Sequence, residues 1–84
     1  MATDVRAKLA EKGLTLPVTS KPIAAYVPAT RTGNLVFTAG QLPMVDGKIA
    51  REGKVGSDLT VDEAKALAEI CALNALAAVE LVAP

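Results

Sequence analysis

The sequence contains no histidine and no tryptophan, and it has only one cysteine, one phenylalanine and one tyrosine among 84 residues. The lack of histidine removes the commonest metal ligand and the commonest general base of enzymes. A single cysteine excludes an intrachain disulfide and a metal site built from cysteines alone. Two aromatic side chains are too few to stack a run of bases, and nine basic residues balance nine acidic ones. Nucleic-acid binding therefore has little support.

What the sequence has in abundance is small apolar side chains, mainly Ala, Val and Leu, and 51% of its residues are apolar. A chain of this length forms one domain at most, and its core is too small to hide that much apolar surface. We therefore expect partner chains. Residues 1–6 show no apolar signal-peptide region, and the longest apolar helix carries Lys65, Glu69 and Glu80. The sequence thus predicts a cytoplasmic protein with no secretory signal and no membrane span.

Residues 3–12 have the signals of a short N-terminal helix. Thr3 is a candidate N-cap, and Gly13 follows as a residue that can adopt the left-handed conformation of a helix stop. Leu14 then stands where a Schellman motif places its apolar residue. We predict a helical extension over residues 1–13.

Residues 60–82 are predicted to form a long helix that begins with a capping box, in which Thr60 and Glu63 bond to each other's backbone. Asn74 falls on the apolar face of this helix, and a buried amide needs partners, so we predict bonds to nearby backbone. Cys71 is predicted to be a buried thiol of low reactivity. At about 100° per residue, the members of the apolar face are Leu67, Ile70, Cys71, Ala75, Ala78, Leu81 and Val82.

The middle of the chain, residues 23–43, predicts a β-hairpin and a loop. Residues 23–27 and the apolar run 35–38 are the expected strands, the second of them well buried, with a turn at Gly33. Gly40 then lets the chain turn sharply or approach a ligand closely. On residue types alone, an ordinary hairpin loop is the simpler interpretation, and a pocket edge with backbone N–H groups is the alternative.

The following segment is predicted to be a charged surface loop with an Asp46-Gly47 turn. Asp46, Glu52 and Asp58 could suggest a metal site, but their spacing fits no calcium-loop template. We interpret them as solvated charges and predict neither a metal nor a cofactor. The strands leave an open sheet edge, and the long helix leaves apolar surface uncovered. We therefore expect the chain to be the first part of a larger domain.

The sequence resembles the Rid family, also called the RidA/YjgF or L-PSP endoribonuclease family, over residues 23–82. Segments 3–13 and 53–60 are similar to its longer subgroup, whose function is poorly defined. The residues that carry the resemblance are Tyr26, Arg31-Thr32-Gly33-Asn34, Thr38-Ala39-Gly40-Gln41-Leu42-Pro43 and Asn74. It implies an α+β, chorismate-mutase-like fold with a mixed sheet and helices on one face, of which this chain carries the N-terminal half.

The resemblance also implies a homotrimer with clefts between subunits, and hydrolysis of amino-acid-derived imines to 2-oxo acids and ammonia. Tyr26 matches the cleft tyrosine of the family, and Gly40 matches a ligand-site glycine with Thr38 and Gln41 beside it. Ala39 departs from the usual serine. The family's carboxylate-binding arginine lies beyond the matching segment, and Arg31 is no match for it. No catalytic residue can be assigned.

Three functions remain as hypotheses. The first is an imine or enamine deaminase whose ligand-binding residues are Tyr26, Thr38, Ala39, Gly40 and Gln41. The second is a non-catalytic trimer that binds a small carboxylate metabolite in the same cleft. The third is a ribonuclease or translation inhibitor, which the missing histidine and missing basic patch make the weakest of the three.

Overall fold

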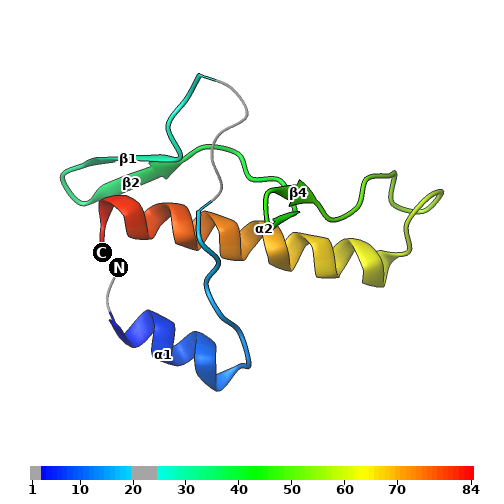
Figure 1. Cartoon of the computed structure of the whole chain (residues 1–84), viewed down its shortest axis with the longest axis horizontal. Helices are drawn as coiled ribbons and strands as arrows, with labels where there is room; N and C mark the ends of the chain where they lie inside the picture. The colour runs from blue at the N-terminus through cyan, green and yellow to red at the C-terminus, as the bar shows by residue number, and fades with distance from the viewer. Residues whose placement is uncertain (1–2, 20–24) are drawn as a thin grey trace.

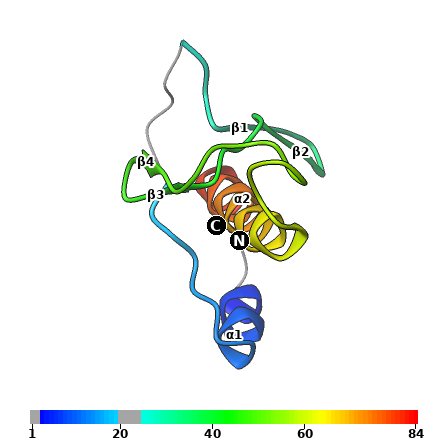
Figure 2. The same ribbon diagram turned by 90° about the vertical axis from the view of Figure 1, so that its right-hand side faces the viewer.

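A computed structural model describes residues 3–19 and 25–84 and shows an α+β chain built around one long helix. Two small antiparallel hairpins lie along one side of this helix, and a short helix lies on its other side (Figures 1 and 2). The elements are α1 (Thr3–Glu11), β1 (Ala29–Thr32), β2 (Leu35–Thr38), β3 (Met44–Val45), β4 (Lys48–Ile49) and α2 (Val61–Val82). Neither helix in the described ranges combines the length and apolar character that a membrane crossing requires.

The capping box predicted at the start of α2 is present. The Glu63 N–H donates to the Thr60 hydroxyl at 3.1 Å, and the Thr60 N–H donates to the Glu63 carboxylate at 3.0 Å. The helix then runs to Val82, as the sequence predicts. Its buried face is narrower than expected, because the hairpins cover only one side. Cys71 is half-buried rather than buried, and Leu81 remains 58% exposed.

Helix α1 ends in the predicted Schellman motif. The Leu14 N–H donates to the Leu9 carbonyl at 2.9 Å, and the Gly13 N–H donates to the Ala10 carbonyl at 3.0 Å. Gly13 has a φ of +74°, which a residue with a side chain rarely adopts. The side chain of Thr3, the first residue of α1, lies outside the described part of the chain, so its capping role stays a prediction.

The β1–β2 hairpin uses a different first strand from the one predicted. Residues 23–24 lie outside the described ranges, residues 25–27 are not a strand, and Ala29–Thr32 pairs with Leu35–Thr38 instead. The reason is the two-residue turn at 33–34, where Gly33 has a φ of +56°. Such a tight turn makes the immediately preceding residues the partners of β2, although three of the four are polar.

Strand β2 is also more exposed than predicted. Ala29 is buried and Val36 is half-buried, which places their side of the hairpin against α2. Because side chains alternate along a strand, Leu35 and Phe37 lie on the opposite face. Their side chains are 60% and 58% exposed. The hairpin therefore presents an apolar outer face that the described residues do not cover.

The second hairpin follows the predicted Asp-Gly turn. Val45 pairs with Lys48, and the two residues between them have positive φ angles, 52° at Asp46 and 79° at Gly47. Positive φ at both central positions is the mark of a type I′ turn, whose twist matches that of the flanking strands. Local sequence chemistry thus sets the backbone conformation of this turn.

The small core lies where the hairpins and the segment after α1 meet α2. Its apolar members, each less than a tenth exposed, are Leu16, Ala29, Leu59, Ala77 and Ala78. None of them is aromatic, so the buried apolar area is modest. The stability of this chain depends strongly on its few buried polar contacts.

An exposed ion pair ties α1 to the last turn of α2. Arg6 Nε donates to Glu80 Oε2 at 2.7 Å, and Arg6 Nη2 donates to the other carboxylate oxygen. The hydrogen bond from Arg6 holds the pKa of Glu80 below its ordinary value. A carboxyl with a lowered folded-state pKa stabilises the fold above its unfolded pKa, and that contribution is lost as the pH falls through the folded pKa.

We therefore expect α1 to loosen when the pH falls below the ordinary pKa of a glutamate side chain, about 4.3. Arg6 stays charged throughout this range. Amide exchange of α1, followed across an acid titration, measures this. Glu80→Gln should loosen α1 already at neutral pH and remove the pH dependence. An acid titration that leaves α1 equally protected throughout would show that the pair does not hold the helix.

Candidate functional site

Four of the five predicted ligand-binding residues lie where β2 passes into the following loop: Thr38 ends β2, and Ala39, Gly40 and Gln41 begin the loop. Its start is fixed, because the Ala39 N–H donates to the Pro28 carbonyl at 2.9 Å. The Gln41 side chain turns back and donates to the Ala39 carbonyl at 3.1 Å. Because the Ala39 N–H already has a partner, a ligand at this loop has to use other groups.

At Gly40, the space beside the backbone of this loop is open. Among the described residues, and apart from its two chain neighbours, no heavy atom lies within 4 Å of the position that a Cβ would occupy, and φ at Gly40 is not positive. The backbone therefore does not require glycine, and the surrounding packing does not require it either. An accessible glycine next to polar side chains leaves room for a ligand to approach the backbone.

Tyr26, the fifth predicted residue, is 44% exposed and belongs to the segment that precedes β1. The bond between Ala39 and Pro28 brings this segment to the same end of the hairpin as the loop. Apart from this contact, the segment before β1 extends away from α2, whereas the loop after β2 runs alongside α2 (Figure 1). The structure thus joins the segment of Tyr26 to the start of the loop only through Pro28, and neither of the two grooves found among the described residues is lined by Tyr26 or residues 38–41.

Asn74 fixes the far end of the loop on α2. This side chain is 8% exposed, and its amide nitrogen donates to the carbonyls of Leu42 and Met44, both at 3.1 Å. The prediction that Asn74 bonds to backbone is therefore confirmed, with partners about 30 residues away in the chain. With Ala39 held at one end and Leu42 at the other, the loop around Gly40 has little freedom.

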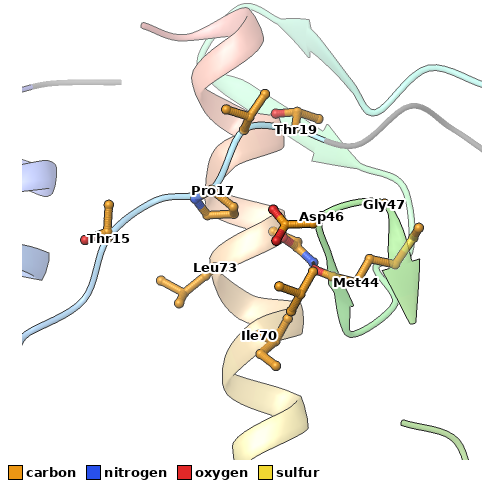
Figure 3. Close-up of a pocket in the computed structure, with 11 residues that line it drawn as sticks. Thr15, Pro17, Thr19, Met44, Asp46, Gly47, Ile70 and Leu73 are labelled. Atoms are coloured by element: carbon orange, nitrogen blue, oxygen red, sulfur yellow. Dashed lines mark hydrogen bonds between the residues drawn. The ribbon is translucent and has the colours of Figure 1, made fainter. Parts of the chain in front are cut away.

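A groove that the sequence did not reveal lies beside the β3–β4 turn (Figure 3). Its volume is about 630 Å³, and its walls come from the segment after α1, the turn itself and the middle of α2. The sequence predicts Asp46 to be a turn residue with a solvated charge, and it predicts no groove beside this residue. The residues that line the groove are Thr15, Pro17, Val18, Thr19, Met44, Val45, Asp46, Gly47, Ile70, Leu73 and Asn74.

A second, smaller groove of about 390 Å³ lies between the segment 49–59 and the first turns of α2. Arg51 supports its wall, because its guanidinium pairs with the Glu63 carboxylate and donates to the Asp58 carbonyl at 3.0 Å. The Asp58 carboxylate accepts from the Lys54 N–H at 2.9 Å. Local reasoning missed the role of Arg51, since its partners lie 7 and 12 residues away.

The structure gives the acidic residues Asp46, Glu52 and Asp58 separate surroundings. Asp46 lines the larger groove, Glu52 lines the smaller one, and Asp58 is bonded within its own loop. Over residues 3–19 and 25–84, no three side chains of His, Cys, Asp or Glu come together as a metal-binding group.

The sequence matches one protein-family model over residues 6–83, nearly its whole length. That model is described as "YjgF/chorismate mutase-like, putative endoribonuclease". The chain is also 37% identical, over 70 residues, to protein TCP17 of Trypanosoma cruzi; the match covers 83% of this chain and 44% of that protein.

Two solved structures share both fold and sequence with the chain. A protein of unknown function from Agrobacterium tumefaciens is 49% identical, with a TM-score of 0.76 over 92% of this chain and 46% of its own. A protein from Shewanella oneidensis, titled a putative endoribonuclease, is 33% identical, with a TM-score of 0.82 over 89% of this chain and 50% of its own. The chain spans half or less of the length of these relatives.

Proposed function

The chain belongs to the YjgF/chorismate mutase-like family, and on this premise we propose that the loop after β2 forms part of a cleft for small imines derived from amino acids. In this proposal the protein adds water to the carbon–nitrogen double bond of the imine. The carbinolamine that forms then loses ammonia and leaves a 2-oxo acid. The open, backbone-exposing Gly40 between two anchored ends of the loop is the observation that carries the proposal.

Imine hydrolysis is compatible with the side chains that this chain provides. Neutral water can attack an imine once the substrate and water are held in position, so the missing histidine is no obstacle. Polar groups at the loop, such as the Thr38 hydroxyl, can orient the imine and the water. Tyr26 adds a phenol at the same end of the hairpin. An anchor for the substrate carboxylate has to come from outside this chain, which spans half or less of the length of its relatives.

Assembly into a homotrimer is part of this proposal. The outer face of the β1–β2 hairpin supports it, because Leu35 and Phe37 are both more than half exposed there. Exposed apolar faces of this kind usually mark a contact surface. A neighbouring copy that packs against this face would lie beside the hairpin that joins the Tyr26 segment to the Gly40 loop, and it would help to close the cleft.

The direct test is ammonia release from 2-aminoacrylate generated in the assay by a pyridoxal-phosphate enzyme. The protein, in the assembly in which it purifies, should accelerate ammonia release above the spontaneous rate. A rate equal to the spontaneous one, from a folded preparation, would remove the deaminase hypothesis.

A non-catalytic role in binding a small carboxylate is the second candidate. Ala39 favours it, because this position carries no hydroxyl and its N–H is already bonded to Pro28. Calorimetry with several 2-oxo acids separates the two candidates, since a binder gives heat without accelerating ammonia release. Absence of heat from every acid would count against this role.

Gly40→Val tests the loop itself. The open space around Gly40 predicts that this variant folds as well as the parent protein. A branched side chain at this point would instead displace a ligand, and we expect ammonia release or 2-oxo acid binding to fall by at least about tenfold. Thermal unfolding and the activity assay together measure the two effects. Unchanged ligand binding in a folded variant would place the site elsewhere.

A further inference from the structure

The groove beside the β3–β4 turn is separate from the loop around Gly40. None of the five residues assigned to the proposed imine cleft lines it. Its volume of about 630 Å³ lies within the range of about 300–1,000 Å³ that is usual for small-molecule sites. Three parts of the chain that are far apart in sequence form its walls, so the groove exists only when the chain is folded.

The walls of this groove are mostly apolar. Pro17 contributes from the segment after α1, and Ile70 and Leu73 contribute from α2. Asp46 is the one charged side chain among the described residues that line the groove, and none of those residues carries a positive charge. Asn74 also reaches it, but its amide nitrogen is already bonded to two carbonyls.

The backbone that carries the exposed Asp46 side chain is held in place by the hairpin. Asp46 and Gly47 form a type I′ turn, and the base of the hairpin is closed by the Ala50 N–H, which donates to the Pro43 carbonyl at 2.9 Å. Asn74 fixes the first strand of the same hairpin through Met44. Figure 3 shows the Asp46 side chain directed from the turn toward the segment that carries Pro17.

We propose that this groove binds a small organic cation, an ammonium or guanidinium group on an apolar body, with the cation at Asp46 and the body against Ile70 and Leu73. A single carboxylate provides too few ligands for Ca²⁺, which takes six to eight oxygens. An anion would meet a like charge. A neutral apolar ligand would remove water from the carboxylate without replacing its hydrogen bonds.

Three matched probes test this assignment, 4-phenylbutylamine as the cation, 4-phenylbutan-1-ol as the neutral analogue and 4-phenylbutanoate as the anion. Dissociation constants come from NMR titrations that follow the methyl groups of Met44, Ile70 and Leu73. We expect the amine to shift all three methyl groups and to bind about two- to fivefold tighter than the alcohol, the range for one solvent-screened charge pair. Equal affinity for amine and alcohol, or no shift at these methyl groups, would overturn the proposal.

Asp46→Asn is the matched variant, because asparagine accepts the positive φ of this turn and Asn-Gly is a preferred type I′ pair. It should remove the preference for the amine while leaving alcohol binding unchanged. Glu69→Gln removes one negative charge from an exposed site outside the groove and should retain the preference. If both variants lower amine affinity equally, the effect is one of net charge, and the site assignment is wrong. Neither result depends on whether 2-oxo acids bind near Gly40.

Discussion

Replacing Asn74 with alanine should lower the free energy of unfolding by about 1–3 kcal/mol, since it leaves the part-buried Met44 carbonyl without a donor and the Leu42 carbonyl with only the Met44 N–H, at 2.8 Å. Asn74 Nδ2 is 3.1 Å from the carbonyl oxygen of Leu42 and 3.1 Å from that of Met44. The core around it contains only small and aliphatic side chains, so little else holds the hairpins to α2. Chemical denaturation, monitored by far-UV circular dichroism, measures the loss.

Two further variants separate the hydrogen bonds from side-chain volume. Asn74→Asp keeps the shape but presents an acceptor to two acceptors, and it should destabilise the protein at least as much as alanine. Glu69→Ala, at an exposed position of the same helix, should change stability by less than about 0.5 kcal/mol. If Asn74→Ala proved as mild as Glu69→Ala, Asn74 would not be the anchor of the loop.

Replacing Gly53 with alanine is the second large effect that we expect. Gly53 has a φ of +149°, and a Cβ built there would lie 2.8 Å from the Cβ of Asp58 and 3.4 Å from Cγ of Leu59. An atom so close to the backbone cannot swing aside, so the loop has to move. That movement would strain the bond from the Lys54 N–H to Asp58. Backbone strain of this kind costs about 1–3 kcal/mol before the clash is counted.

Gly40→Ala is the control for this variant. The same substitution meets open space and no positive φ there, so stability should stay unchanged or rise by up to about 1 kcal/mol. Thermal unfolding of both variants, with amide exchange at Leu59, measures the contrast. Equal stability of the two variants would show that the segment around Gly53 adapts freely and that its geometry is not required.

Local sequence chemistry predicted the helices well. The Thr60 capping box and the Gly13 stop involve residues within a few positions of one another, so their spacing carries the information. The type I′ turn at Asp46 is local for the same reason. The first strand was placed wrongly, because apolar content pointed to residues 23–27 whereas the tight turn after Thr32 set the pairing.

The site could be predicted only in part. Family resemblance selected the loop around Gly40, and the amide at Asn74 could be recognised as needing partners, but its partners Leu42 and Met44 follow only from tertiary packing. The role of Arg51 and the groove at Asp46 also depend on residues that meet through the fold. A charged residue at a surface turn has the same local pattern whether or not a groove lies beside it.

We propose that the loop after β2 binds a small carboxylate ligand. A backbone NMR titration of the protein with 2-oxobutanoate tests it most directly, because both the deaminase and the non-catalytic binder require this interaction. We expect saturable shifts concentrated at Thr38, Gly40 and Gln41, and their loss in Gly40→Val. Shifts that are absent, or that persist unchanged in Gly40→Val, would contradict this proposal.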